Sequence, residues 1–221
     1  MVSLRKILTP NQDLLLNLLS EEKSITDNFY LSGGTALAVY YLNHRYSEDL
    51  DFFSYNEFEA IQIQAILEKI KAKGKIKLFD FQKSLNRNLF FIHFSKEIIK
   101  TEFTYYPFKQ IEEPKVINNF KIDSLLDIAV NKFFTIYQSP RSRDFIDLYF
   151  ILEKQNWTLS YLKKYARIKF DTFIDPLQLS QQIFLVKKLK DYPRMIINIK
   201  PENWQNFWLS EMNNLKKEVL V

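Results

Sequence analysis

The 221-residue sequence predicts an α+β fold in which a mixed sheet is flanked by helices and followed by a helical second half. Strand-like stretches, rich in β-branched and aromatic residues, fall before residue 106. From residue 121 onward the apolar residues recur at helical spacing. The chain is 47% hydrophobic with 20 Phe and 12 Tyr, which excludes disorder as its main state. We therefore expect two domains, over residues 1–120 and 121–221.

The first domain is expected to begin with a helix, a strand, a helix and a strand, at residues 11–19, 28–32, 35–42 and 49–53. A long helix should then cover residues 56–73, with Asn56 as its N-cap, Glu59 as the capping-box partner and Gly74 as its stop. Three strands separated by short turns follow, at residues 75–82, 88–95 and 98–105.

The second half is expected to be helical throughout. A loop bracketed by Pro107 and Pro114 precedes it. Helices are then expected at residues 122–138, 142–153 and 158–169, after Asp175-Pro176, and from Pro201 toward Lys217. Pro176 suits the first turn of its helix, because the backbone N–H that proline lacks has no partner there.

A Gly-Gly pair lies between the first expected strand and the short helix after it. Gly33 and Gly34 lack a Cβ, so the backbone can turn tightly there and bring its N–H groups close to an anion. The helix over residues 35–42 directs its positive N-terminal end to the same place. This segment therefore indicates a phosphate site.

Two aspartates lie two residues apart on the next expected strand. Asp49 and Asp51 therefore project from one face, whereas Leu50 and Phe52 point to the core. Positions two residues apart on a strand are roughly 6.6 Å apart, and two such carboxylates can share hard divalent cations. The strand therefore predicts metal binding beside the phosphate site.

Two aspartates provide too few ligands for a pair of metal ions about 3.5–4 Å apart, so such a pair would need a third carboxylate. Glu102 is the candidate, because the alternation over residues 98–105 places it on the polar face of an otherwise core strand. Asp80, on an earlier strand, is its rival. The alternative for Glu102 is a solvent-facing side chain paired with Lys100.

A second group of charged residues lies in the helical half. Asp144 and Asp147 are three residues apart and share a helix face, and Lys132 lies on the preceding helix. The ammonium of Lys132 suits a triphosphate, and Arg143 or Arg141 would add a bidentate fork. Lys132, Arg143, Asp144 and Asp147 could instead form a salt-bridge network that holds the two helices together. Both interpretations stay open.

The segment SGGTAL, residues 32–37, precedes HRYSEDLDFF, residues 44–53. A Gly-Gly turn, a helix and then Asp-hydrophobic-Asp-hydrophobic resembles the signature of the nucleotidyltransferase fold of polymerase-β-like enzymes. More narrowly, these segments resemble the AbiEii/AbiGii toxin family of nucleotidyltransferases. Lys132 followed by Arg-Asp-x-x-Asp at residues 143–147 is similar to the later signature of that family. The resemblance covers residues 30–152.

The resemblance implies transfer of a nucleoside monophosphate from an NTP to an acceptor, with Mg²⁺ or Mn²⁺ as cofactor. The metal ligands would be Asp49, Asp51 and Glu102, and Lys132 and Asp147 would complete the catalytic residues. A larger set would bind the nucleotide: Gly33, Gly34, Thr35, Arg45, Ser47, Lys132, Arg143 and Asp144. The helical domain would close over the nucleotide site.

The resemblance also implies a setting in bacterial toxin–antitoxin or phage-defence systems, with an antitoxin protein encoded nearby. We expect RNA as the acceptor, because some members of the family modify tRNA. Residues 1–54 hold four Lys/Arg and seven Asp/Glu, whereas residues 121–221 hold sixteen and eleven, and a basic surface around an acidic metal pocket suits a polyanion. Two alternatives remain: a small-molecule nucleotidyltransferase of the antibiotic-modifying kind, and a catalytically silent binding module.

Several classes of site are excluded. The sequence has no cysteine, which excludes disulfides, thiolate metal sites and cysteine nucleophiles. His44 and His93 are too few and too far apart in sequence to suggest a zinc site. We expect neither a signal peptide nor a membrane span, because the apolar stretch before Pro10 is too short, and we therefore expect a cytoplasmic protein.

Overall fold

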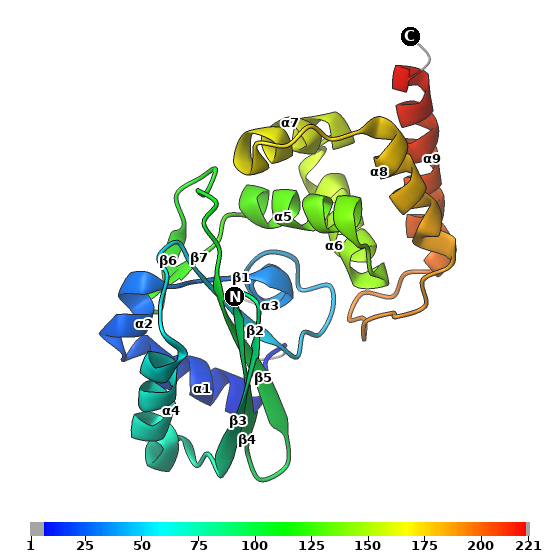
Figure 1. Cartoon of the computed structure of the whole chain (residues 1–221). Coiled ribbons are helices and arrows are strands. Elements are labelled where there is room, and N and C mark those ends of the chain that lie inside the picture. Colours follow the sequence, from blue (N-terminus) through cyan, green and yellow to red (C-terminus); the bar gives the residue numbers. More distant parts are fainter. Residues whose placement is uncertain (1–6, 220–221) are drawn as a thin grey trace. The chain divides into compact units, whose positions relative to one another are not determined.

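The computed structural model describes residues 7–219, with side chains described to residue 215 (Figure 1). The chain divides into two compact units. The first contains the residues up to Tyr41 together with Tyr46–Ser124, and the second contains Leu42–Arg45 together with the chain from Leu125 onward. The short segment Leu42–Arg45 therefore belongs to the second unit, although its neighbours in sequence belong to the first.

The first unit is built on a sheet that has seven strands within the described residues. Across the sheet the order is β3 (Leu78–Ser84), β4 (Arg87–His93), β5 (Ile98–Tyr105), β2 (Leu50–Ser54), β1 (Tyr30–Ser32), β7 (Phe120–Ile122) and β6 (Lys115–Ile117). β2 pairs in parallel with β5, and β1 pairs in parallel with β7, whereas the other neighbours are antiparallel. The sheet is mixed, and the predicted α+β class is confirmed.

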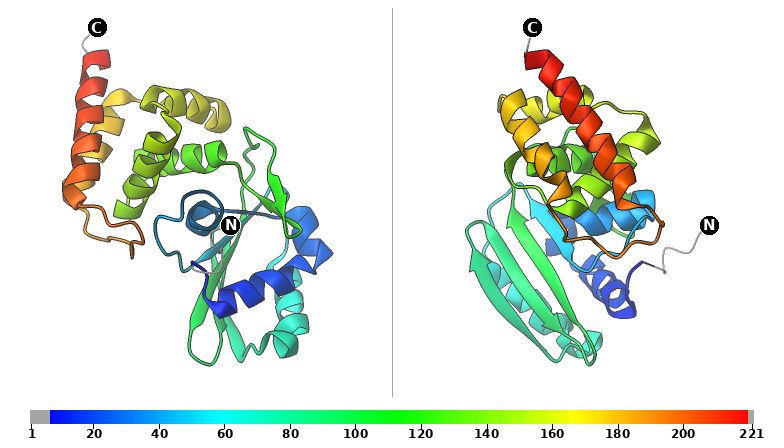
Figure 2. Two further views of the ribbon diagram at one scale, coloured as in Figure 1. Left: turned by 180° about the vertical axis from the view of Figure 1, so that it is seen from behind. Right: turned by 90° about the vertical axis from the view of Figure 1, so that its right-hand side faces the viewer.

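Helices cover both faces of this sheet (Figures 1 and 2). α1 (Pro10–Ser20) and α4 (Ala60–Gly74) pack against each other on one face, and α3 (Gly33–Leu37) lies on the other. α1 begins at a capping box in which the side chains of Thr9 and Gln12 each accept a hydrogen bond from the other residue's backbone. The fully buried rings of Phe52 and Phe103 stack with centroids 5.0 Å apart and form part of the core.

The predicted start of the long helix is wrong. α4 begins at Ala60, and Glu59 is its N-cap without a side-chain hydrogen bond. The backbone N–H of Asn56 instead donates to Ser54 Oγ at 3.1 Å, so Asn56 belongs to a turn after β2. At the other end, Lys75 rather than Gly74 is left-handed, with φ of 54°. Gly74 is small for a packing reason, because a Cβ there would lie 3.0 Å from Leu18 Cδ1 of α1.

Two further parts of the first unit differ from the expectation. The short helix α2 (Lys23–Asn28) precedes β1, and the hairpin β6–β7 lies between the expected loop and the expected helix, with Ile122 of β7 at the predicted start of that helix. Asn118 and Asn119 make the hairpin turn with φ of 48° and 66°. Asparagine tolerates this left-handed conformation better than most residues, so the Asn-Asn pair is the sequence signal for the turn.

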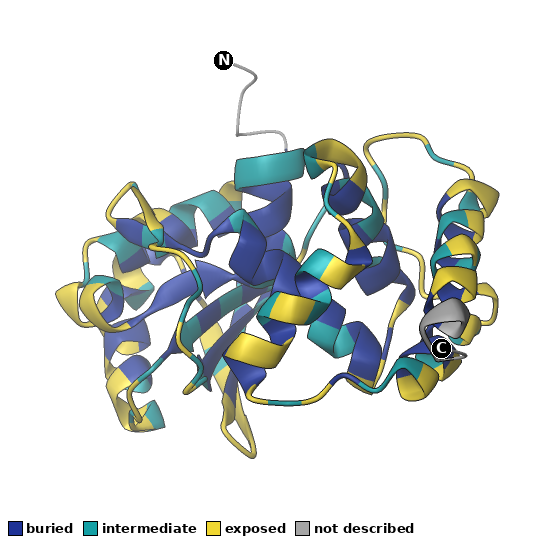
Figure 3. Cartoon of the chain, turned by 90° about the horizontal axis from the view of Figure 1, so that it is seen from above, coloured by how far each residue is buried: buried dark blue, intermediate teal, exposed yellow. Residues whose placement is uncertain are grey.

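The second unit is helical, as predicted. Its helices are α5 (Leu125–Gln138), α6 (Ser142–Gln155), α7 (Leu159–Phe170), α8 (Pro176–Phe184) and α9 (Pro201–Val219), with a 3₁₀ turn at Leu185–Lys187. Figure 3 shows that these helices carry buried residues on one side and exposed residues on the other. Trp208 of α9 is fully buried, and its indole N–H donates to the carbonyl of Phe145 at 3.0 Å. None of the helices within residues 7–219 is both long and apolar enough to cross a membrane.

Candidate active site

Three carboxylates lie along the paired strands β2 and β5 or directly beside them. In the parallel register of these strands Asp51 is the partner of Glu102, and Asp49 lies immediately before β2. Leu50 and Phe52, which alternate with the aspartates, are 0% exposed and point into the core. The sheet therefore brings the predicted third carboxylate next to the Asp-x-Asp pair.

Asp80 is placed elsewhere. It lies on β3, and β4 and β5 separate this strand from β2. Its carboxylate contacts His93 Nε2 at 2.7 Å, with the Asp80 side chain 67% exposed. The strand order therefore favours Glu102 over Asp80 as the third carboxylate.

The Gly-Gly turn lies against Asp51. Gly33 is left-handed with φ of 71°, and a Cβ added there would collide with Asp51 Oδ2. After Gly34, α3 continues into a π-helical turn, Ala38–Leu42. Thr35 is fully buried, and its hydroxyl donates a short hydrogen bond to the backbone carbonyl of Asp49. Thr35 thus ties the helix to the aspartate strand, whereas Gly33 and Gly34 are partly exposed.

Two basic residues hold the carboxylates. Arg87 donates a bidentate pair of hydrogen bonds to Glu102, from Nε to Oε1 at 2.6 Å and from Nη2 to Oε2 at 2.5 Å. Thr104 Oγ1 donates to Oε1 at 2.7 Å, and Lys100 Nζ donates to Asp49 Oδ2 at 3.0 Å. Burial would raise the pKa of Glu102, but the hydrogen bonds from Arg87 and Thr104 outweigh it and the net pKa is lowered. Glu102 is therefore an anion paired with Arg87.

The chemistry of these carboxylates fits a hard divalent cation, because Mg²⁺ and Mn²⁺ prefer oxygen ligands. As the side chains stand, no three His, Cys, Asp or Glu residues in the described part of the chain are grouped closely enough to hold one ion. The strand positions of Asp51 and Glu102 match such a site, and the side chain of Glu102 is engaged by Arg87. The donor set therefore fits in kind, and the strand register places Asp51 and Glu102 side by side.

The second charged cluster lies within the helical unit. Lys132 Nζ of α5 contacts Asp144 Oδ1 at 3.0 Å and Asp147 Oδ2 at 2.7 Å, both on α6. Arg141, rather than Arg143, adds the guanidinium, with Nε 2.8 Å from Asp144 Oδ2. Lys132 is only 7% exposed. This geometry is that of a salt-bridge network between two helices, and phosphate binding by Lys132 stays a prediction.

The segment Leu42–Arg45 is bound into the same cluster. His44 Nε2 lies 2.7 Å from Asp147 Oδ1, and Arg45 donates to both Asp147 oxygens at 2.6 and 2.8 Å. Asp147 and His44 are 0% exposed and Arg45 is 3% exposed. Burial opposes ionisation of Asp147, but Lys132 and Arg45 hold its pKa well below the usual value. Asp147 therefore positions this segment from inside the unit.

A comparison with protein families identifies the class of protein. The model of the family described as "Nucleotidyl transferase AbiEii toxin, Type IV TA system" matches residues 17–208. The chain belongs to this family. It is a nucleotidyltransferase of the AbiEii toxin class, and the resemblance seen in the SGGTAL and HRYSEDLDFF segments is confirmed.

Individual proteins are also similar to this chain in sequence or in fold, in agreement with the AbiEii assignment. An uncharacterized protein of Aquifex aeolicus is 31% identical over 183 residues, which cover 79% of this chain and 83% of that protein. The crystal structure of JHP933 from Helicobacter pylori superposes with a TM-score of 0.57 at 19% identity, covering 95% of this chain and 93% of that one. The nucleotidyltransferase toxin MenT4 of Mycobacterium tuberculosis gives a TM-score of 0.57 at 13% identity, covering 92% and 82%. The two structures support the AbiEii fold.

Two residues of the charged clusters, Arg87 and His44, were not predicted from the sequence to be there. The expected alternative partner of Glu102 was Lys100, but the partner is Arg87, and Lys100 contacts Asp49 instead. His44 was considered only as a metal ligand, and it is a buried partner of Asp147. No sequence signal pointed to Arg87, because its contact depends on the register of β4 against β5, in which Arg87 lies two residues before the partner of Glu102.

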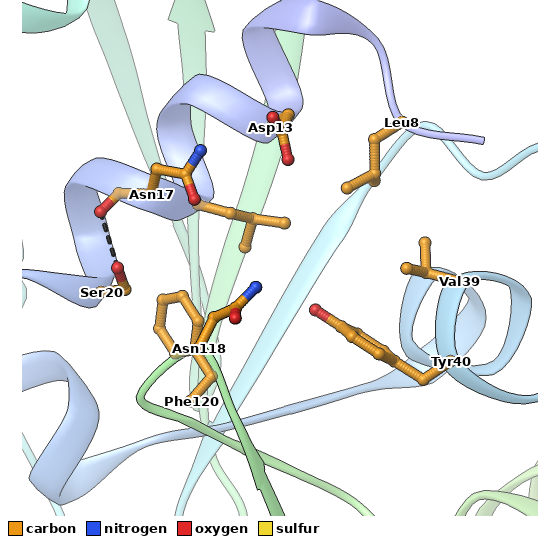
Figure 4. A pocket seen from close by; sticks show the side chains of 9 residues that line it. Leu8, Asp13, Asn17, Ser20, Val39, Tyr40, Asn118 and Phe120 are labelled. Atoms are coloured by element: carbon orange, nitrogen blue, oxygen red, sulfur yellow. Dashed lines mark hydrogen bonds between the residues drawn. The ribbon is translucent and has the colours of Figure 1, made fainter. Parts of the chain in front are cut away.

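A small pocket lies elsewhere in the first unit, next to α1, the π-helical turn and the β6–β7 hairpin (Figure 4). Its lining residues are Leu8, Asp13, Leu16, Asn17, Ser20, Val39, Tyr40, Asn118 and Phe120. Burial, and then the charge of Asp13, raise the pKa of the Tyr40 hydroxyl, so this phenol stays neutral. The lining includes none of the residues predicted to bind metal or nucleotide.

Proposed function

We propose that this AbiEii-family enzyme transfers a nucleoside monophosphate from an NTP where the start of β2 pairs with the middle of β5. The observation that carries the proposal is the pairing of Asp51 with Glu102 on adjacent parallel strands, directly beside the left-handed Gly33. A metal ion at these carboxylates would link them to phosphate groups bound at the turn, and this pairing therefore supports a metal-assisted reaction.

Asp49, Asp51 and Glu102 would hold Mg²⁺ or Mn²⁺. A divalent ion there would offset the charge of the triphosphate and lower the pKa of the attacking hydroxyl. The backbone N–H groups at Gly33 and Gly34 would bind phosphate oxygens, with Ser47, which is also partly exposed, beside them. Thr35 would act indirectly, by holding the Asp49 backbone.

The basic residues of the helical unit divide into two groups. Lys132 and Arg45 are buried against Asp147 and would stabilise the unit, because binding a triphosphate would require them to leave that carboxylate. Asp144, 1% exposed between Lys132 and Arg141, has the same role. Arg143 is partly exposed on α6 and is the better candidate for a phosphate ligand.

RNA is the proposed acceptor, and α7 offers the surface that supports it. Trp157, Tyr161 and Tyr165 form a row of partly exposed rings with centroids 5.3 and 4.9 Å apart. Lys164 lies over the ring of Tyr165 at 5.8 Å, Arg167 is exposed, and α7 contains no acidic residue. Aromatic rings that stack on bases, interleaved with cations that contact phosphates, are typical of single-stranded nucleic-acid binding.

Resemblance to tRNA-modifying members of the family makes tRNA the first RNA to test. A toxin of this kind would act in the cytoplasm, where NTPs and tRNA are found, and would be countered by an antitoxin protein. Growth arrest on expression of the wild-type chain in a bacterial host, relieved by the neighbouring gene, would support this setting. A role in phage defence would appear as fewer plaques on a host that carries both genes.

The experiment is incubation of the protein with each α-labelled NTP, Mg²⁺ and total cellular RNA, followed by a denaturing gel. We expect label in one RNA size class with at least one NTP, and loss of the signal in EDTA. A parallel reaction contains aminoglycosides in place of RNA and is resolved by thin-layer chromatography. Label on the aminoglycoside alone would replace RNA by a small-molecule acceptor, and absence of label from every acceptor would favour a silent binding module.

A further inference from the structure

Arg87 occupies the carboxylate oxygens of Glu102 that a metal ion would have to bind. Its guanidinium contacts both carboxylate oxygens of Glu102, and one of these oxygens also accepts from Thr104. The Glu102 side chain is 8% exposed, whereas Arg87 is 48% exposed and reaches the carboxylate from the surface. Glu102 is therefore held within the sheet, whereas the Arg87 side chain borders solvent and can move away from the carboxylate.

Two carboxylates of this group are paired with basic side chains. Arg87 contacts Glu102. Lys100 Nζ contacts Asp49 Oδ2, which belongs to a second carboxylate of the group. Clustered carboxylates repel one another unless a cation lies among them. Two side-chain cations supply that charge in this structure.

We propose that Arg87 is a positioning residue that holds Glu102 ready for a divalent ion and gives up its place to that ion. Arg87 and the ion need the same carboxylate oxygens, so they cannot both bind Glu102 fully. The pair keeps Glu102 oriented before the ion arrives. This inference rests on the proposed function, because it assigns Glu102 to the metal.

The first test is Mn²⁺ binding in the absence of NTP and acceptor, measured by electron paramagnetic resonance of the free ion. Arg87→Met keeps much of the side-chain length and removes the competing charge. We expect it to bind Mn²⁺ about 3- to 10-fold more tightly than wild type, the effect of one partly exposed ion pair. Arg87→Lys, which keeps a charge without the fork, should lie in between.

Lys83→Met is the matched control. Lys83 is an exposed residue of β3 in the same hairpin and makes no ion pair recorded in the described part of the chain. Its loss removes the same charge and should leave the Mn²⁺ affinity within about twofold of wild type, as expected for a screened surface charge. Equal tightening in both variants would assign the effect to net charge and would overturn the inference.

The second test uses the unaltered protein. Phenylglyoxal modifies arginine, and its rate at Arg87 can be followed by mass spectrometry of the peptide. We expect faster modification with saturating Mn²⁺ than without it, because the guanidinium has left Glu102. An unchanged rate in a protein that binds Mn²⁺ would overturn the inference.

The two proposals fail in different ways. If wild type and Arg87→Met bind Mn²⁺ equally and Asp51→Asn does not bind it, the role of Arg87 is wrong and the metal site stands. If neither wild type nor Arg87→Met binds Mn²⁺, the metal site itself is wrong, and the inference fails with it.

Discussion

The carboxylate of Asp51 fills the space that a side chain at Gly33 would need. The two residues meet because β1 and β2 pair with Ser32 opposite Asp51, so the chain turns at Gly33 directly over the aspartate. The turn also requires a φ of 71°. Both conditions favour glycine over any residue with a Cβ.

Gly33→Ala should therefore damage the site and strain the fold. The Cβ would displace Asp51, and a left-handed alanine costs about 1 kcal/mol or more. We expect a strong loss of nucleotidyl transfer with a small fall in melting temperature. Gly34→Ala is the control, because Gly34 lies in α3 without a positive φ. Equal activity of the two variants would contradict the close approach of Gly33 to Asp51.

Lys132→Met tests the cluster of the helical unit. The variant leaves Asp144 and Asp147 buried without their shared ammonium, and the loss of one partner of a buried ion pair costs about 3–5 kcal/mol. Chemical denaturation should show this loss in the absence of nucleotide. Arg143→Met changes a partly exposed residue of α6. This variant should leave stability nearly unchanged and weaken NTP binding in calorimetry. A stable Lys132→Met protein that no longer binds NTP would restore the phosphate role of Lys132.

Stability should fall as the pH is lowered from 7 to 5. Burial lowers the pKa of His44 despite the opposing charge of Asp147, and the ring's Nδ1 is buried without a hydrogen-bond partner in the described structure. Below about pH 6.5 the unfolded chain therefore binds a proton that the folded chain does not, which favours unfolding by at most about 1.4 kcal/mol per pH unit. His44→Gln should flatten this part of the profile in denaturant titrations. An identical profile in the variant would show that His44 does not contribute.

A further loss is expected below about pH 4. The folded pKa of Asp147 is held well below the unfolded value near 3.9, so its stabilisation is present above that value and is lost as pH falls toward the folded pKa. Asp144, whose net pKa is also lowered because Lys132 and Arg141 outweigh burial, acts in the same direction. Asp147→Asn should already be destabilised at pH 7 and should lose less on acidification.

RNA binding should depend on salt and on α7. Lys164→Glu with Arg167→Glu should weaken binding of a single-stranded RNA and reduce the slope of log K against log salt by about 1.4, if each residue contacts one phosphate. Tyr161→Ala with Tyr165→Ala should weaken binding without changing the slope, because stacking releases no counterions. Lys187→Glu with Lys188→Glu makes the same charge change on exposed residues beyond α8. Equal effects of both charge reversals would remove the case for α7.

The sequence was sufficient for the parts of the fold that follow local patterns. The helices of the second unit, the Gly-Gly turn and the Asp-x-Asp strand have strong local signals, and the structure has them. The β6–β7 hairpin was missed because each strand has only three residues. Asn56 was predicted to be a helix N-cap, but its backbone N–H donates a hydrogen bond to the hydroxyl of Ser54, two residues earlier.

The contacts in the candidate site depend more than the helices do on pairing between segments that are distant in sequence. The adjacency of Glu102 to Asp51 was expected, but the bidentate contact of Arg87 follows from the register of β4 against β5, which the sequence does not specify. Lys169 illustrates the same limit. It looks like one of the basic residues of α7, yet its ammonium is buried against Asp127 at 2.6 Å and is unavailable to RNA.

We propose that Asp49, Asp51 and Glu102 together form the catalytic centre. The most direct test compares label transfer from an α-labelled NTP by wild type, Asp51→Asn, Glu102→Gln and Asp80→Asn, each shown to be folded by circular dichroism. We expect Asp51→Asn and Glu102→Gln to lose about 100- to 1,000-fold in rate, the several kcal/mol that metal-assisted charge stabilisation supplies, and Asp80→Asn to retain the wild-type rate. Wild-type transfer by folded Asp51→Asn protein, or an equal loss in Asp80→Asn, would rule out this catalytic centre.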